Sequence, residues 1–456
     1  MSTISPPADS TVDLTLPEPD LAATLVTRIE PLRWSLATRI AFRITVVYFS
    51  LYVLCTQMLW ALIPIPVNVN VANVGPWAWI RPLAVWVGEH VIGFPGPVSS
   101  SPGGSGDKAY DWSQAVTILG LSIVAAIVWS LVARSRTRHV AVQKWFRLFL
   151  RFSIASTMVS YGMVKLFPLQ MPAPSLSRLL EPFGNFSPMG VLWASIGASK
   201  SYEMFAGAME LIAAVLLFIP GLTTIGALVC FAVVTQIFTL NMTYDVPVKL
   251  FSFHLLVMCA VLIAPELKRL AQFFVLNRAV EPSTEPPLLS GRRARRIAIA
   301  TQIVFAAYIV GFNWYRAADG AKQFGADAPK PPLYGIWNIE RMTIDGHERA
   351  PLVTDYDRWR RVLVGTRNAV SFQRMDSTFE AQTAAVDMNA KTMTLSKPAN
   401  KEWGRFTFQQ PAPDRLILDG TANGHAIRME TRLVDHTKFL LSSRGFNWVQ
   451  ELPFNR

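Results

Sequence analysis

The chain has 456 residues, of which 51% are hydrophobic and only 16% are charged, and its mean hydropathy is +0.29. Soluble globular domains carry about 25% charged residues, so this composition excludes a protein whose whole surface faces water. The formal net charge of +12 does not indicate nucleic-acid binding, because the basic residues cluster beside apolar segments, as juxtamembrane residues do. The composition therefore predicts an integral membrane protein.

The expected membrane segments follow a polar, proline-containing start. Residues 1–36 lack the apolar run of a signal peptide and are expected to form a disordered cytoplasmic tail. A spanning helix needs about 20 mostly apolar residues. Seven segments meet this requirement: 40–63, 114–133, 146–167, 202–220, 222–242, 247–274 and 295–315. The tryptophan-containing stretch 76–94 and the run 188–197 are expected at the membrane interface instead.

The basic connections predict the orientation of these spans. The loops at 134–151 and 265–296 are rich in Lys and Arg, which places both on the cytoplasmic side. Four predicted spans separate them, so the two assignments agree. We therefore expect a multi-pass protein of the bacterial inner (cytoplasmic) membrane, with a cytoplasmic N-terminus and everything after Arg316 outside the cytoplasm.

The chain changes character after the prolines at 329–332. Short runs of alternating polar and apolar residues are separated by turn pairs such as Asp345-Gly346 and Asn423-Gly424. Strands are expected at 335–344, 369–374, 391–396, 405–409, 415–419, 426–434 and 438–442, with a helix at 356–364. This pattern predicts an extracytoplasmic antiparallel β-barrel or sandwich over 330–456.

Polar side chains inside the spans are the candidate functional residues, because ionisable groups are costly to place in a membrane. Glu210 and His254 lie well inside their spans and are the candidates for proton exchange. The candidate ligand-binding residues lie at similar depth or nearer the outer face: Tyr161, Lys165, Gln236, Asn241, Asp245 and Lys249. The alternative is a polar network that only holds the helices together. The five-residue spacing of Lys249 and His254 places them on different helix faces, which counts against one tight cluster.

Other sequence features indicate structure rather than chemistry. Cys55, Cys230 and Cys259 each lie in an apolar run and are expected to be small buried hydrophobes. The glycine-rich segment 103–111 lacks the flanking residues of a phosphate loop, so it predicts a solvated hairpin before the second span. No metal-ligand spacing is present.

Three short motifs resemble those of a known family. The segments Tyr161–Lys165 and Gly207–Glu210, followed by Pro220-Gly221, resemble the DoxX-like family of bacterial membrane proteins. The segments 187–190 and 244–250 resemble a longer subgroup of that family. The resemblance implies a four-helix core over 145–275. It also implies an association with membrane redox complexes, since the family takes its name from a thiosulfate:quinone oxidoreductase subunit.

The C-terminal region carries a second resemblance. Gly335-Ile336-Trp337 resembles the first strand of a lipocalin, and Arg444 resembles the late lipocalin arginine that packs on that tryptophan. The helix expected at 356–364 departs from a plain up-and-down barrel.

These expectations divide the chain and suggest three functions. The expected parts are a tail (1–36), two spans with an extracytoplasmic loop (37–144), the DoxX-like core (145–275), a basic loop with the seventh span and linker (276–329), and the barrel (330–456). The first hypothesis is a quinone-linked oxidoreductase subunit that uses quinone and no metal. The alternatives are a module that binds or transports a lipid or small apolar ligand, and a non-catalytic assembly factor. Membrane lipid and redox-complex subunits are the expected partners, and nucleic acid is not.

Overall fold

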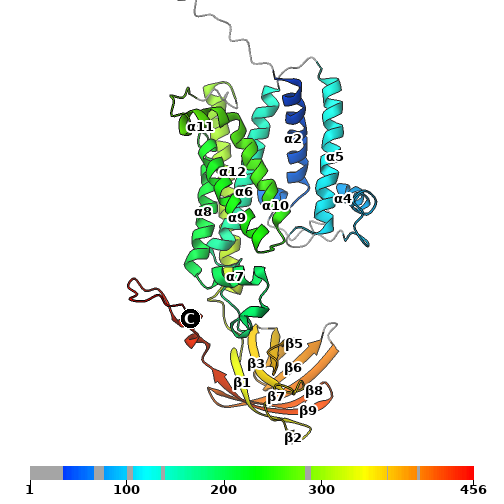
Figure 1. Cartoon of the computed structure of the whole chain (residues 1–456), viewed down its shortest axis with the longest axis vertical. Helices are drawn as coiled ribbons and strands as arrows, with labels where there is room; N and C mark the ends of the chain where they lie inside the picture. Colours follow the sequence, from blue (N-terminus) through cyan, green and yellow to red (C-terminus); the bar gives the residue numbers. More distant parts are fainter. Residues whose placement is uncertain are drawn as a thin grey trace, which may run out of the picture.

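The computed structural model describes residues 34–65, 76–99, 106–134, 139–282, 289–366, 368–397 and 401–455. A bundle of long helices and a β-barrel are joined by α12 (Arg292–Phe324), and the barrel lies at one end of the bundle (Figure 1). Most of the predicted tail, residues 1–33, falls outside the described residues.

Among the described residues, six helices are long and apolar enough to cross a membrane. They are α2 (Leu36–Leu54), α5 (Ala109–Val132), α8 (Lys200–Phe218), α9 (Thr223–Thr243), α10 (Lys249–Ile263) with its continuation through η5 (Ala264–Glu266) and α11 (Leu267–Phe274), and α12. The chain is therefore a multi-pass helical membrane protein.

The third predicted span is α6 (Val140–Leu166), which is less apolar and is not one of these six. It runs alongside the other long helices (Figure 1). Every residue from Leu150 to Val159 is buried, so other helices surround the middle of α6. Because protein rather than lipid contacts it, α6 accommodates charged residues such as Arg151 and Lys165.

The shorter helices refine the prediction. The first predicted span is broken, since α2 ends at Leu54 and a separate α3 (Met58–Leu62) follows. In the break, Gln114 donates a hydrogen bond to the carbonyl of Cys55 (3.0 Å), which α2 leaves unpaired.

The tryptophan-containing stretch forms α4 (Pro76–Val87) and the π-helical η2 (Gly88–Ile92). The 3₁₀ turns η3 (Arg178–Leu180) and η4 (Phe183–Asn185) lead to α7 (Pro188–Gly197) at the barrel end of the bundle (Figure 1).

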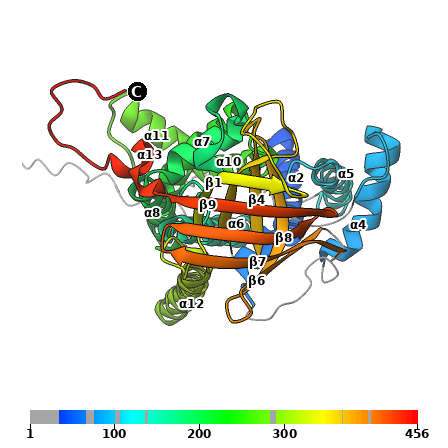
Figure 2. The same cartoon turned by 90° about the horizontal axis from the view of Figure 1, so that it is seen from below.

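The C-terminal region is a closed antiparallel barrel. Its strands are β1 (Gly335–Ile344), β2 (His347–Glu348), β3 (Trp359–Thr366), β4 (Ala369–Arg374), β5 (Phe379–Asp387), β6 (Thr392–Lys397), β7 (Lys401–Ala412), β8 (Arg415–Ala422) and β9 (His425–Val434). From β3 onward each strand pairs with the next, and β1 pairs with both β3 and β9. Eight strands thus close an up-and-down barrel, seen from below in Figure 2, while β2 is a short addition to β1.

Some predictions for the barrel were wrong. The helix expected at 356–364 is strand β3, and β5 was not predicted. The outward-facing Leu363 of β3 is buried against Leu176 of the bundle, so β3 lacks the polar alternation that marks a half-exposed strand. The strand expected at 438–442 is instead η7 (His436–Lys438) followed by α13 (Leu440–Ser443). Because β1 pairs with β9, the barrel leaves no free strand edge with which segment 438–442 could pair.

The barrel interior is filled by large side chains. Trp337, Phe372 and Phe406 are at most 1% exposed. Along β9, Ile427 and Met429 are buried as the alternation predicted. Such a packed interior is the main source of the barrel's stability.

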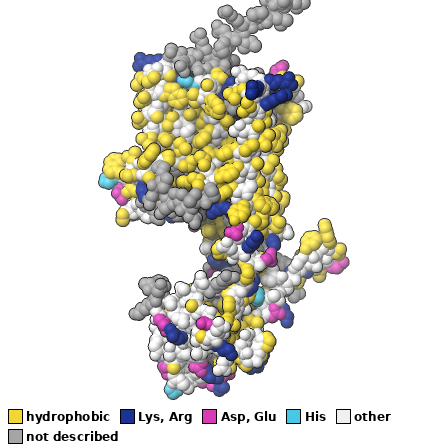
Figure 3. Space-filling model, turned by 180° about the vertical axis from the view of Figure 1, so that it is seen from behind, with side chains coloured by type: hydrophobic (Ala, Val, Ile, Leu, Met, Phe, Trp, Pro, Cys, Tyr) yellow, Lys and Arg dark blue, Asp and Glu magenta, His cyan; other side chains and the backbone are white. Residues whose placement is uncertain are grey.

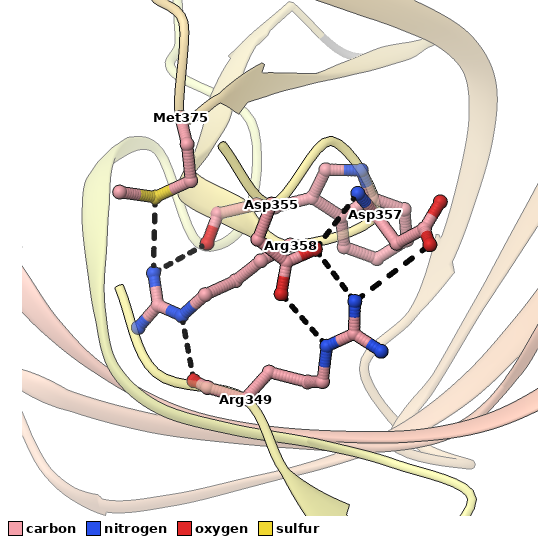
Figure 4. Close-up of polar contacts among 6 residues, drawn as sticks. Arg349, Asp355, Asp357, Arg358 and Met375 are labelled. Atoms are coloured by element: carbon pink, nitrogen blue, oxygen red, sulfur yellow. Dashed lines mark hydrogen bonds and ion pairs between the residues drawn. The ribbon is translucent and has the colours of Figure 1, made fainter. Parts of the chain in front are cut away.

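The predicted contact of Arg444 with Trp337 is wrong. The Arg444 guanidinium lies 4.4 Å from the ring centroid of Phe454, and the Trp337 indole donates to the carbonyl of Leu333 (2.8 Å). Among the described residues of the barrel, Arg358 is the buried arginine, and it donates to the carbonyl of Arg349 at 2.9 Å (Figure 4). The Arg349 side chain in turn makes two 2.7 Å hydrogen bonds to Asp355.

Candidate functional site

The candidate site begins where α6 and α8 cross at close range. A Cβ atom on Gly207 would lie 2.6 Å from the carbonyl oxygen of Gly162, so these two glycines allow the helix backbones to touch. This approach brings the Lys165 Nζ atom within 2.6 Å of Glu210 Oε1, with the two side chains 10% and 1% exposed. Two residues that were predicted separately, Lys165 and Glu210, thus form a buried ion pair.

One oxygen of this ion pair has no hydrogen-bond partner among the described residues. Glu210 Oε2 is buried and makes no hydrogen bond to any described residue. Glu203 lies two turns earlier on the same face of α8, and it also has one buried carboxylate oxygen without a hydrogen bond to a described residue. Its Oε1 accepts from the backbone N–H groups of Met171 (2.9 Å) and Gln170 (3.2 Å), whereas its Oε2 lacks a partner among the described residues. Buried acceptors are almost always satisfied, so two such oxygens on one helix face indicate a place for a donor.

Tyr161 connects the ion pair to the neighbouring helices. The Lys165 ammonium lies 5.5 Å from the centroid of the Tyr161 ring. The Tyr161 hydroxyl accepts from Gln57 Nε2 (3.1 Å), and its ring contacts Phe251 of α10 with 6.1 Å between centroids. Of the predicted site residues, the structure therefore brings Tyr161, Lys165 and Glu210 together.

His254 packs against aromatic side chains of α2. Its Nδ1 is 2.7 Å from the carbonyl of Leu250, and its Nε2 is 2.6 Å from the hydroxyl of Tyr48. A carbonyl only accepts, which assigns the proton to Nδ1 and leaves Nε2 to accept from Tyr48. The imidazole also stacks on Tyr52 with 4.0 Å between centroids and 3° between planes.

Tyr48 and Tyr52 were missed at the sequence level. Their four-residue spacing places both on one face of the first span, and this was the signal available. The two predicted proton-exchange residues thus occupy different settings. Glu210 pairs with a cation, and His254 is held between a backbone carbonyl and a tyrosine hydroxyl.

The remaining candidates lie elsewhere. Asn241 donates to Ser252 Oγ (3.0 Å), and Lys249 pairs with Asp245 (2.7 Å), whose side chain is 82% exposed. Gln236 is exposed on α9. The structure therefore places Asn241, Asp245 and Lys249 around the connection from α9 to α10 and leaves Gln236 outside the site.

Part of the glycine-rich segment has a structural role that the sequence did not reveal. The first residues of this segment, 103–105, lie outside the described residues. In the described part, both carboxylate oxygens of Asp107 accept 2.8 Å hydrogen bonds from the backbone N–H groups of Lys249 and Leu250. Asp107 therefore satisfies free donors at the start of α10.

The fold and the site together define a polytopic helical membrane protein with a buried polar site and a C-terminal antiparallel β-barrel. No protein-family profile and no solved structure matches the chain. The chain is 31% identical over 127 residues to the "Uncharacterized protein YwoB" of Bacillus subtilis (strain 168), a match that covers 26% of this chain and 72% of that protein. The chain therefore belongs to the same family as YwoB, a relationship that assigns no activity.

Proposed function

We propose that the bundle is the quinone-binding subunit of a membrane oxidoreductase, in which Glu210 and His254 exchange protons with a bound quinone or quinol. The observation that carries this proposal is the buried Glu210 Oε2 atom, which has no partner among the described residues. A quinol hydroxyl supplies the donor that this oxygen lacks, whereas a purely apolar ligand does not.

The surrounding residues suit proton transfer. Oxidation of a quinol releases two protons and two electrons, and the electrons would pass to a redox partner in the same complex. Lys165, at 2.6 Å from Oε1, stabilises the Glu210 carboxylate until a proton arrives at Oε2. At His254, Nε2 accepts from the Tyr48 hydroxyl, so this pair can take up or release a second proton. The resemblance to the DoxX-like family supports the same class of function.

We further infer that the protein resides in the bacterial inner membrane, with its N-terminus in the cytoplasm and its barrel outside. The basic loops support this orientation through the positive-inside rule. The barrel and the first described residues lie at opposite ends of the bundle (Figure 1).

A non-catalytic assembly factor is the second candidate. The direct pairing of Lys165 with Glu210 across two touching glycines is also what a purely structural contact between helices requires. The transport alternative is less favoured, because Trp337, Phe372 and Phe406 fill the barrel interior that a carried ligand would occupy.

Mass spectrometry of the small molecules that co-purify with the full chain tests the proposal. We expect an isoprenoid quinone with the wild-type protein. The Glu210→Gln variant, which lacks the carboxylate, should bind it about 10- to 100-fold more weakly, the loss typical of a hydrogen bond to a charged group. Gln236→Leu is the matched control, because that exposed side chain lies outside the site. Absence of quinone from the wild type, or equal retention by Glu210→Gln, would favour the assembly factor.

A further inference from the structure

The last described residues, 440–455, form a C-terminal arm that begins where the barrel meets the bundle. Strand β9 ends at Val434, opposite the start of β1, which follows the linker from α12. Just before the arm, Phe439 packs against an apolar cluster that contains Leu176 of the bundle. The arm then extends sideways from this junction, and its tip lies level with α7 (Figure 1). It is therefore placed at the end of the bundle that faces the barrel.

The C-terminal arm is folded into a loop. Gly445 has a φ of 62°, a conformation that glycine adopts at no steric cost, and it turns the chain at the base of the arm. Next to it, Arg444 donates to Gln450 Oε1 (3.0 Å) and lies 4.4 Å from the ring centroid of Phe454. These contacts bring the two ends of segment 444–454 together, so the residues between them project as a loop.

The loop presents apolar side chains that the described part of the protein leaves uncovered. Phe446, Trp448, Val449 and Leu452 are 77%, 91%, 78% and 80% exposed. The rings of Phe446 and Trp448 meet edge to face, with 5.0 Å between centroids. Apolar side chains gather at the tip of the arm (Figure 3). An exposed apolar patch of this kind indicates a contact surface.

The lipid-facing surface of the bundle identifies what that surface contacts. Tyr202 at the start of α8 and Trp314 and Tyr315 on α12 are exposed, and aromatic rings at the ends of spans are typical of the membrane interface. The barrel end of the bundle therefore carries an interfacial belt, and the arm projects from the same end of the bundle. From Gly445 to Asn455 the described arm contains no helix or strand. Its backbone groups need water, so it suits the headgroup region and not the hydrocarbon core.

We propose that the C-terminal arm is a membrane anchor, which inserts Phe446, Trp448 and Leu452 into the lipid headgroup region beside the bundle. A lipid surface is the occupant because the arm continues the surface through which the bundle already contacts lipid. Insertion holds the barrel close to the membrane on its own side. This role is independent of any quinone, since it involves none of the residues around Glu210.

The proposal is tested with the full chain in phosphatidylcholine nanodiscs, using a nitroxide label on Val449→Cys. The native cysteines are buried and should take up little label. Collisions with oxygen, which concentrates in lipid, should dominate over collisions with a water-soluble nickel complex. The reference is His347→Cys, an exposed position on β2 at the end of the barrel away from the bundle (Figure 1), where nickel collisions should dominate.

Two outcomes of this measurement would overturn the proposal. An oxygen-to-nickel ratio at Val449→Cys equal to that at His347→Cys would place the arm in water. A label shielded from both reagents would place the arm against protein, such as a second copy of the chain.

A second arm of the experiment identifies the side chains that insert. Phe446→Ser combined with Trp448→Ser, in the labelled Val449→Cys chain, should lower the population of the inserted state about tenfold per ring, the effect of losing one buried aromatic side chain. The oxygen-to-nickel ratio should then fall toward that of His347→Cys. Leu352→Ser combined with Val353→Ser is the matched control, because it removes two exposed apolar side chains of the barrel outside the arm. An unchanged ratio in the first pair, or an equal fall in both pairs, would contradict the anchor.

Discussion

The bundle and the barrel distribute apolar and charged side chains in opposite ways. The bundle exposes apolar side chains and buries charged ones, and the barrel does the reverse. On α5, Val124 and Ile127 are 59% and 55% exposed, whereas Glu210 in the interior of the bundle is 1% exposed. In the barrel, Trp337 is 1% exposed, and an outward-facing pair, Arg405 with Glu402, is 61% and 55% exposed. The surrounding solvent explains the difference, because apolar side chains are at no disadvantage in lipid but are driven inward in water.

This comparison also shows which charged residues can indicate a functional site. The exposed ion pairs of the barrel each contribute about 0–1 kcal/mol and mark no site. A charged group inside the bundle must be paired, and it is retained at a cost. For this reason the Lys165–Glu210 pair is informative about function, and the surface pairs of the barrel are not.

The largest expected effect comes from breaking the buried pair. Lys165→Met leaves the Glu210 carboxylate without its cation and should destabilise the bundle by about 3–5 kcal/mol. The double variant Lys165→Met/Glu210→Leu removes both charges and should recover most of that loss. Unfolding of the full chain in mild detergent measures both effects. A single variant as stable as the wild type would show that the pair is not buried from solvent.

The double variant also separates structure from function. If it is stable but co-purifies with no quinone, the pair belongs to the ligand site. If it is stable and retains quinone, Glu210 is not the group that binds it.

The corresponding test in the barrel removes its largest fully buried side chain, Trp337. Because β1 closes on β9, we expect the fragment 330–456 to fold alone. Trp337→Ala should destabilise it by about 3 kcal/mol or more through the cavity that it leaves. Arg444→Ala and Trp448→Ala are the controls, because Arg444 does not contact Trp337 and Trp448 is 91% exposed. Both should stay within about 0.5 kcal/mol of the wild type in urea unfolding, and a Trp337→Ala fragment of wild-type stability would contradict the packed interior.

A smaller effect is expected from the polar network of Figure 4. The two hydrogen bonds that Arg349 donates to Asp355 hold the pKa of that carboxyl below its usual value. Because the folded pKa is below the unfolded one, which is about 3.9, the pair stabilises the barrel above that pH. The contribution is lost as the pH falls through the folded pKa.

Asp355→Asn should therefore lower stability by about 1 kcal/mol or less at pH 7 and have less effect near pH 3. Urea unfolding of the fragment at the two pH values measures this. Asp357→Asn is the control, since its carboxylate is 3.7 Å from Arg349 and 81% exposed. An equal effect of Asp355→Asn at both pH values would contradict the assignment.

Much of the fold could be predicted from local patterns. Apolar length located the helices, and alternation with tight turns located β1 and β4 at their observed bounds. Strand β3 was missed because contact with Leu176 buries its outer face, and that contact is tertiary. Arg444 was assigned by analogy with another fold, although its position after β9 places it outside the barrel.

The candidate site could also be predicted only where local patterns determine it. The four-residue spacing of Tyr161 and Lys165 gave their shared helix face, and the motif pointed to Glu210. Depth in the membrane did not give the rotation of α9, so Gln236 was included although it is exposed. The contact of His254 with Tyr48 joins residues 206 positions apart, and no local pattern predicts such a pair.

The central claim is that the bundle lies in the membrane, with its basic end and its barrel on opposite sides, and single-cysteine labelling tests this most directly. The native residues Cys55, Cys230 and Cys259 are buried and should react little. Ala390, in the turn between β5 and β6, and Ala141, at the start of α6, are both exposed. In cells with an intact inner membrane, a membrane-impermeant maleimide should label Ala390→Cys at once and Ala141→Cys only after permeabilisation. Labelling of both before permeabilisation, or the reverse order, would contradict the account.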